Sequence, residues 1–450
     1  SMRVGMRWDW ETFPEYMDSL DKQGLGVNVG ALVPFSPMRG YVLGMVPARE
    51  RTSVTEAELN QMKQIMHDGM KAGAFGISAD MNQEDRCEDG SALPSHVAST
   101  EEYMAMAEVM GEFGVGHIGW TLGLGHDDAT LDGFRKLISD MARVSGRPLH
   151  FEGGNAPAEW FDAARAEGLN IVLQEVAMEV DAEFTLAEYN LFDYMPNWVN
   201  PLVGTADERA AKLRDPEVRA GMKRDVDHGP SDQGANSAMQ DERTDWTTFR
   251  ILEVAHERNH KYEGMTIAQL ADQENKHPVD ALLDLALDED LLTEFSHIVA
   301  FGDENKIEQN IKNPYAHISV SDGGAHTRFL TVSTWPIHFL SHWVRDKQLM
   351  SIEAAHQKMS AFPAWFTDFK DRGTLRLGNW ADIIVYNMDE LGLQYEKPIF
   401  ATDFPGGERR LIQKPKGLRY TIVNGTVTFE GNDCTGALPG KLLRSYDMVS

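Results

Sequence analysis

Cysteine is nearly absent from the sequence. The 450 residues include only Cys87 and Cys434, too few for a disulfide framework or for a structural zinc site built from four cysteines. The count favours a reducing, cytoplasmic compartment. The chain also has no uninterrupted apolar run of about eighteen residues, and its start does not show the basic-then-apolar pattern of a signal peptide. We therefore expect no membrane span.

Basic residues are also scarce. Lys and Arg number 42 against 70 Asp and Glu, which gives a formal net charge of -28. Such a charge repels phosphate backbones and anionic membrane surfaces, so we expect neither nucleic acid nor a membrane as partner. A small molecule is the expected partner, and the sequence leaves a homo-oligomer open. Because 42% of the residues are hydrophobic, the chain can bury one large core and a smaller one.

Two common catalytic signatures are missing, and a third is present. No GxGxxG follows a predicted strand, which argues against a dinucleotide site, and no GxSxG argues against a serine hydrolase. The stretch HERNH, residues 256–260, satisfies HExxH, in which two histidines one helical turn apart bind zinc. A metalloprotease is therefore a distant alternative. Against it, the intervening Arg258 and Asn259 are strongly polar and the helix would be short.

Helical and strand patterns alternate along the first two-thirds of the chain. Thr55 with Glu58 forms a capping-box pattern, Gly73 ends the helix, and a strand follows at 74–79. The same order recurs and gives seven predicted strands, at 27–33, 74–79, 115–123, 147–154, 169–180, 296–302 and 317–324. Helices between strands imply crossovers and parallel pairing.

The strand count defines the predicted architecture. A closed (β/α) barrel has eight strands, so we predict an α/β fold with a TIM-like barrel that lacks its first strand. An open doubly wound sheet is the alternative, disfavoured because no phosphate loop follows a strand. We assign residues 1–365 to the barrel, with an irregular insertion near 181–250. Residues 366–450, with the turn Asn424-Gly425, form a predicted small β domain.

Residues 319–327 read SVSDGGAHT, directly after a predicted buried strand. Glycines let the backbone turn sharply, and Asp322 and His326 are both able to bind a metal or move protons. Active sites of such barrels lie at the carboxyl ends of the strands. There, Asp322 could ligate a divalent metal and accept a proton from the metal-bound water. The competing interpretation is a turn in which Asp322 bonds to its own backbone.

Several segments carry a family resemblance. The order along the chain is WDWETFPEYMDSL, KAGAFGIS, YEGMTIAQLA, SDGGAHT, HWVRDKQLMSIEAA, DRGTLRLGNWADIIVYN and DFPGGERRLIQKPKGLRYTIVNGTVTFEG. Over nearly its whole length, the chain resembles the N-acyl-D-amino-acid deacylases, or D-aminoacylases, a branch of the amidohydrolase superfamily. That resemblance implies a barrel followed by a small C-terminal β-sandwich.

The resemblance also implies an activity and a site. The expected enzyme is a metal-dependent hydrolase acting on carbon-nitrogen bonds other than peptide bonds, typically the amide of an N-acyl-D-amino acid, with one or two zinc ions (Zn2+). Zinc-bound hydroxide would attack the carbonyl, and Asp322 would carry the proton to the leaving amine. Asp322 and His150 would be metal ligands. His326 and Arg328 would contact the substrate.

The sequence departs from the family pattern at the metal ligands. The family's first strand carries a His-x-His pair, and no His-x-His occurs in the 450 residues; the family's Asn-Cys-Gly stretch is also absent. A catalytic zinc usually takes three protein ligands, and only Asp322 and His150 match. Three explanations remain: a gene start placed too far downstream, which we favour, a partner chain that supplies the segment, or a catalytically silent member that binds a small ligand or acts in an assembly.

Overall fold

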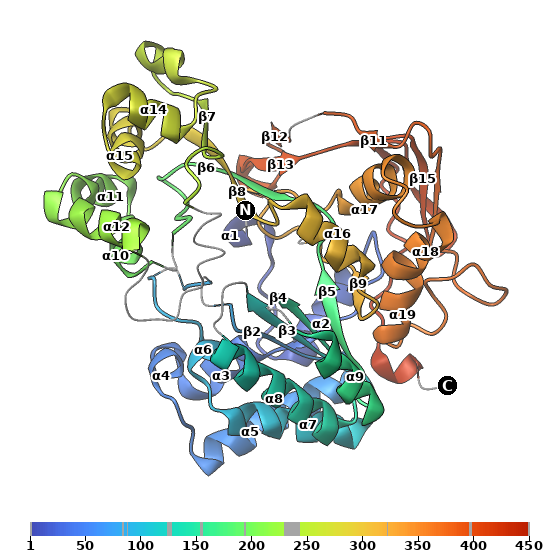
Figure 1. Cartoon of the computed structure of the whole chain (residues 1–450). Coiled ribbons are helices and arrows are strands. Elements are labelled where there is room, and N and C mark those ends of the chain that lie inside the picture. The colour runs from blue at the N-terminus through green and yellow to red at the C-terminus, as the bar shows by residue number, and fades with distance from the viewer. Residues whose placement is uncertain are drawn as a thin grey trace.

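The computed structural model describes residues 2–82, 85–87, 89–123, 128–153, 156–192, 195–228, 244–321, 323–395 and 398–448. Figure 1 shows three regions: a parallel sheet backed by helices in the lower half, a mainly helical insertion at the upper left, and a C-terminal region at the right. Within the described residues, no helix combines the length and the apolar character needed to cross a membrane.

The parallel sheet has six strands within the described residues. They are β1 (Val33–Pro34), β2 (Gly76–Asp80), β3 (His117–Gly123), β4 (Leu149–Gly153), β5 (Ile171–Glu175) and β9 (Ala316–Ile318). The strands lie in the order β1-β2-β3-β4-β5-β9, and every neighbouring pair is parallel. Consecutive parallel strands joined by helices are the arrangement of a TIM-like barrel. Described strands β1 and β9 are the two edges and do not pair, and the absence of a first strand stays a prediction.

Helices cover one face of this sheet. They are α3 (Phe35–Leu43), α5 (Glu56–Lys71), α7 (Thr100–Phe113), α8 (Asp128–Ser145) and α9 (Ala158–Ala166). The capping box predicted at the start of α5 is present, since the Thr55 side chain accepts from the Glu58 amide and Glu58 accepts from the Thr55 amide. Methionine and branched side chains of these helices pack against alternate residues of the strands and form one hydrophobic core. The sheet therefore has one apolar face and one face left for other groups.

The strand predicted at 296–302 forms, but it does not join the parallel sheet. It is β8 (Glu294–Ala300), which pairs antiparallel with β6 (Val180–Phe184) and β7 (Arg250–Glu253). Its apolar pattern predicts a buried strand equally well in either sheet, and the pattern does not identify the partner strand. The assignment of this strand to the barrel was wrong.

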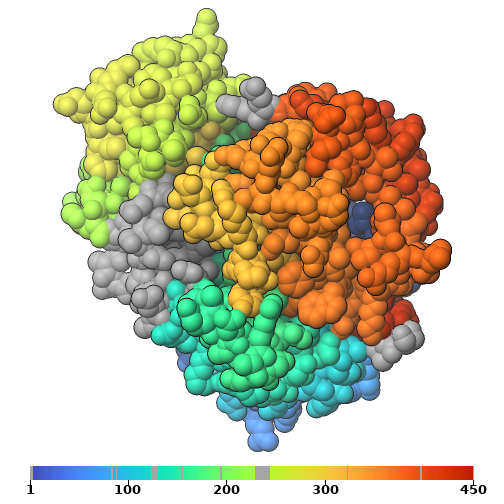
Figure 2. All heavy atoms as spheres, turned by 45° about the vertical axis from the view of Figure 1, so that its right-hand side comes forward, coloured from blue at the N-terminus to red at the C-terminus, as the bar shows by residue number. Residues whose placement is uncertain are grey.

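The stretch near 181–250, which we expected to be irregular, contains regular elements. Strand β6 begins it, and helices follow: α10 (Pro196–Val199), η1 (Asn200–Leu202), α11 (Ala206–Leu213) and α12 (Pro216–His228). The sheet β6-β8-β7 packs with these helices, α14 (Ile267–Glu274) and α15 (Pro278–Asp288) around a hydrophobic core of its own. Figure 2 shows this insertion, in yellow-green, as a lobe at the upper left of the molecule.

The last third of the chain is first helical and then antiparallel. Its helices are α16 (Glu304–Lys312), α17 (Trp335–His338), η3 (Phe339–Asp346), α18 (Ile352–His356), η4 (Gln357–Ala361) and α19 (Phe362–Phe366). The largest C-terminal sheet contains β10 (Ile383–Tyr386), β15 (Leu418–Val423), β16 (Thr426–Glu430) and β17 (Asp433–Cys434). The predicted turn joins β15 to β16, with Asn424 at φ 49° and Gly425 at φ 82°, as a tight hairpin requires.

Short elements complete the described chain. They are α1 (Met2–Gly5), α2 (Phe13–Gln23), α4 (Met45–Glu50), α6 (Pro94–Val97), η2 (Glu257–Tyr262), β11 (Gly392–Leu393), β12 (Ile399–Ala401), η5 (Pro405–Gly407), β13 (Arg410–Ile412), β14 (Pro415–Lys416) and η6 (Ser445–Met448). Two further antiparallel pairs, β11-β14 and β12-β13, accompany the four-stranded sheet.

Candidate functional site

The second face of the parallel sheet is polar. In β2, Ile77 and Ala79 pack into the helix-covered core, so strand alternation places Ser78 and Asp80 on the opposite, inner face. The register pairs Asp80 with Thr121 of β3 and Thr121 with Glu152 of β4. These three side chains therefore form one row, which we call the carboxyl-end row, across the ends of neighbouring parallel strands. This is the end at which barrels of this type carry their chemistry.

The Asp80 carboxyl of the carboxyl-end row has a strongly shifted pKa. Burial raises the pKa of Asp80 to about 8, and repulsion by Asp85 and Glu152 adds to the effect. One Asp80 oxygen accepts a hydrogen bond from the Asn82 amide at 2.8 Å, and the Asn82 side chain donates to Asp85 at 3.2 Å. Asp80 thus keeps its proton near neutral pH, which is the state a general acid needs.

A hydrogen-bonded chain continues the inner face onto β9. The Gln174 side-chain nitrogen donates to the Ser319 hydroxyl at 2.9 Å, and Ser319 lies 2.9 Å from Nδ1 of His317. Ser319 is the first residue of the SVSDGGAHT stretch. The first residue of that stretch is therefore connected to β5 through a side chain, directly after the backbone ladder between β5 and β9 ends at Ile318.

Three histidines cluster on the inner face nearer the amino ends of the strands. The ring centroids of His117 and His150 lie 5.1 Å apart, and those of His150 and His317 lie 5.8 Å apart. The ring of Phe366 from α19 contacts all three. Burial lowers the pKa of His117 to about 3 and of His317 to about 4, and it lowers the pKa of His150 well below its usual value. These imidazoles are neutral at physiological pH.

We tested whether the described residues suit the metal that the family resemblance implies. Neutral imidazoles are suitable ligands, and Nδ1 of His117, Nδ1 of His150 and Nε2 of His317 are buried without a hydrogen-bond partner. However, no group of three or more His, Cys, Asp or Glu side chains within the described ranges could hold a metal ion. The described donor set alone does not fit a catalytic zinc.

Of the two predicted metal ligands, the structure describes one. Asp322 lies outside the described residues, so its predicted roles as ligand and proton carrier stay predictions. His150 is the second residue of β4, near the amino end of the strand, and its predicted role as a ligand stays a prediction. Glu152, two residues further on, lies on the same inner face and nearer the carboxyl end of the strand.

The two predicted substrate contacts lie on one loop. His326 is exposed and has a positive φ of 52°, and its ring lies 5.3 Å from that of Phe329. The Arg328 guanidinium donates to the Glu188 carboxylate, with Nε at 2.8 Å, and lies 3.8 Å from Glu408. A substrate carboxylate at Arg328 would therefore compete with Glu188.

The same loop is attached to two other regions. The Glu183 amide of β6 donates to the Phe329 carbonyl at 2.6 Å, and the Leu411 amide of β13 donates to the Thr327 carbonyl at 2.6 Å. The Phe329 ring stacks on Tyr189 with centroids 4.4 Å apart. The insertion and the C-terminal region thus both hold the loop that follows the predicted catalytic residue.

The HERNH stretch does not form the zinc helix of a metalloprotease. His256 precedes the 3-10 helix η2, in which residues four apart do not share a face because a turn takes about three residues. Asn259 is buried and donates to Asp288 at 2.7 Å. The Glu289 carboxylate accepts from the backbone amide of His256 at 3.0 Å. These contacts give the stretch a structural role in the insertion.

Sequence analysis missed the carboxyl-end row. Asp80 and Glu152 are single acids at the ends of the strand patterns GISAD and LHFEG, where alternation points them away from the apolar face. That position was the available signal, because barrel chemistry occurs at this end.

A family model described as the amidohydrolase family matches residues 3–429. An uncharacterized protein of Mycobacterium tuberculosis (strain ATCC 25618 / H37Rv) is 26% identical over 462 residues, which cover 95% of this chain and 72% of the relative. D-aminoacylase of Alcaligenes xylosoxydans xylosoxydans is 22% identical over 454 residues, covering 98% of this chain and 75% of that enzyme.

Solved structures give the same picture of the fold. A crystal structure of D-aminoacylase matches with a TM-score of 0.58 at 17% identity, over 96% of this chain and 75% of that one. N-acyl-D-glutamate deacylase from Bordetella bronchiseptica, complexed with zinc and a phosphonate inhibitor, matches with a TM-score of 0.55 at 19% identity and the same coverage. The resemblance to the D-aminoacylase branch that we found in the sequence is confirmed.

Proposed function

Because this chain belongs to the amidohydrolase family and is a hydrolase of carbon-nitrogen bonds, we propose that it hydrolyses the amide of a small N-acylated D-amino acid. The substrate class comes from the two similar enzymes, D-aminoacylase and N-acyl-D-glutamate deacylase. The observation that carries the proposal is the carboxyl-end row, in which Asp80 retains a proton at the catalytic end of the parallel strands.

Amide hydrolysis needs a group that accepts a proton from the attacking water and one that protonates the leaving amine. We assign the first role to Asp322. The Asp80 carboxyl has a pKa of about 8. It therefore still carries its proton at neutral pH and can give it to the leaving amine. His326 and Arg328 remain the proposed substrate contacts, with Arg328 exchanging Glu188 for a substrate carboxylate.

Zinc is a separate part of the proposal. The similar deacylase structure contains zinc, and we propose one or two zinc ions here with Asp322 and His150 among the ligands. The described residues alone do not supply three ligands, so we assign no reaction step to the metal. Elemental analysis of the purified chain, with Asp322→Asn and His150→Asn beside it, measures whether zinc is bound and whether these residues hold it.

The same shortage of ligands favours a second candidate, a silent member of the fold that binds a small ligand. A panel of N-acetyl-D-amino acids, with the L-enantiomers as matched substrates, separates the two. The hydrolase releases free amine from D-substrates only, and Asp322→Asn and Asp80→Asn each lower kcat by about 10²-fold or more. Asp132→Asn, on the exposed face of α8, is the control and keeps full activity. No release from any compound, with or without added zinc, supports the silent candidate.

A further inference from the structure

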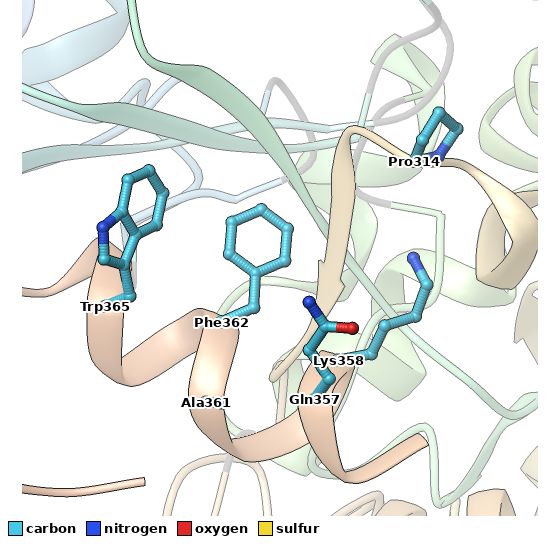
Figure 3. Close-up of a pocket in the computed structure, with 6 residues that line it drawn as sticks. All are labelled: Pro314, Gln357, Lys358, Ala361, Phe362 and Trp365. Carbon is cyan, nitrogen blue, oxygen red and sulfur yellow. The ribbon is translucent and has the colours of Figure 1, made fainter. Parts of the chain in front are cut away.

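A separate pocket lies at the amino end of β9, the opposite end of that strand from Ser321. Its volume is about 430 Å³, and its lining residues are Pro314, Gln357, Lys358, Ala361, Phe362 and Trp365. Figure 3 shows the side chains of Gln357, Lys358, Phe362 and Trp365 projecting from the same side of the helical stretch formed by η4 and α19. A volume of this size is typical of small-molecule sites, which measure roughly 300–1,000 Å³.

The charge of the lining differs from that of the chain. One residue of the lining is basic and none is acidic, although acids outnumber bases by 70 to 42 overall. The Lys358 ammonium donates to the backbone carbonyls of Asn313 at 2.7 Å and of Ala316 at 2.9 Å. An ammonium has three hydrogens, and the third meets no acceptor among the described residues. Lys358 is thus held in place and keeps one donor for a ligand.

The buried groups near Lys358 do not neutralise it. Burial raises the pKa of Glu175 to about 8, so this carboxyl is mainly protonated at neutral pH, and it accepts from Asn310 at 3.0 Å. Burial lowers the pKa of Lys358 itself to about 8, with attraction to Glu175 opposing the decrease. The lysine therefore carries most of its charge at pH 7.

Two aromatic rings form the apolar part of the pocket. Trp365 is 59% exposed, which is unusual for an indole, and its ring centroid lies 5.9 Å from that of Phe362. Phe362 in turn packs on His317 at 5.5 Å, so this wall is fixed to β9. The lining residues from η4 belong to a π-helical turn, a deviation that occurs frequently at functional sites.

We propose that this pocket binds a small monocarboxylate with a planar apolar body, the carboxylate on Lys358 and the body against Trp365 and Phe362. A ligand with a single negative charge suits the site, because the protein's net charge of -28 repels ligands with several negative charges more strongly. The Gln357 amide supplies a second hydrogen bond to the carboxylate. This site is independent of the amide hydrolysis proposed above, and its occupant is not the hydrolysed substrate.

Calorimetric titration of the full chain with phenylacetate tests the proposal, with phenylacetamide as the uncharged match. We expect saturable binding of phenylacetate and about tenfold or more weaker binding of phenylacetamide, because a charge-assisted hydrogen bond is lost. Trp365→Ala weakens phenylacetate binding about tenfold through loss of aromatic contact. Trp8→Ala removes an indole of similar exposure, 56%, and leaves binding unchanged.

Two further variants separate this site from the inner face. Asp80→Asn leaves phenylacetate binding unchanged even if it abolishes hydrolysis, and Trp365→Ala leaves hydrolysis of N-acetyl-D-amino acids unchanged. The proposal is overturned if phenylacetate shows no saturable binding, if phenylacetamide binds equally well, or if Trp365→Ala and Trp8→Ala behave alike.

Discussion

The two ends of one inner face respond to burial in opposite directions. In the carboxyl-end row, burial raises the pKa of Asp80, whereas in the histidine cluster near the amino ends burial lowers the pKa of His117 and His317. The physical cause is the same, since a poorly solvated group avoids its charged form. The Asp80 carboxyl and the imidazoles of His117 and His317 are therefore mainly uncharged at neutral pH. The difference is that the Asp80 carboxyl can donate a proton, whereas the histidine rings can offer nitrogen lone pairs.

This comparison predicts opposite pH dependences of stability. For Asp80 the folded pKa, about 8, exceeds the unfolded value of about 3.9, so the unfolded state loses its proton first and stability falls as the pH rises from about 4 to 8. Asp80→Asn removes this loss. We expect the variant to match the parent at pH 4 and to exceed its free energy of unfolding at pH 7 by on the order of 3 kcal/mol.

Urea unfolding of both proteins at the two pH values measures this effect. Asp132→Asn serves as the control, because the Asp132 side chain is 74% exposed. Parallel pH profiles for the parent and Asp80→Asn would show that the Asp80 carboxyl is ionised in the fold, and the contrast between the two ends would disappear.

The histidine cluster predicts the reverse slope. His117 has a folded pKa of about 3, below the unfolded value of about 6.5. As the pH falls below about 6.5 the unfolded state binds a proton that the folded state does not, and stability decreases. His117→Leu removes the proton site. Measured against the parent, its free energy of unfolding should therefore be about 2 kcal/mol higher at pH 5 than at pH 7.5. His260→Leu, at an exposed position, should show no such gain; an equal gain in both variants contradicts the prediction.

The smallest expected effect concerns the hydrogen-bonded chain between the ends. Ser319→Ala removes the hydroxyl that joins Gln174 to His317 and should cost about 1–2 kcal/mol, because two partly buried polar groups lose a partner. Ser139→Ala is the matched control, since the Ser139 hydroxyl donates only to the carbonyl of Arg135 in its own helix. Thermal unfolding at pH 7 compares the two variants. Equal melting temperatures would show that the hydrogen bonds of Ser319 do not stabilise β9.

Local features of the fold could be predicted from the sequence, and distant pairings could not. The α5 capping box and the β15-β16 turn depend on neighbouring residues, and both were correct. Strand β8 was recognised as a strand, but its partners lie more than forty residues away along the chain. Nothing in an apolar run specifies whether its neighbours will be parallel or antiparallel.

The site was less predictable than the fold. His150 was predicted as a ligand from the family resemblance, and it lies two residues before Glu152 in β4, a spacing of about 7 Å along the same face of the strand. Asp80 went unnoticed because an isolated aspartate after an apolar strand resembles an ordinary turn residue. Its unusual pKa arises from burial, then from Asp85, and to a smaller extent from Glu152 on another strand; the burial and the approach of Glu152 depend on the three-dimensional arrangement.

The loop at 326–329 is held by the insertion and by the C-terminal region. Strand β6 and strand β13 hold its backbone, and Tyr189 and Glu188 hold its side chains, while the parallel sheet contributes none of these contacts. Changes in the insertion would therefore shift this loop while the strands that carry Asp80 and Glu152 stay as they are.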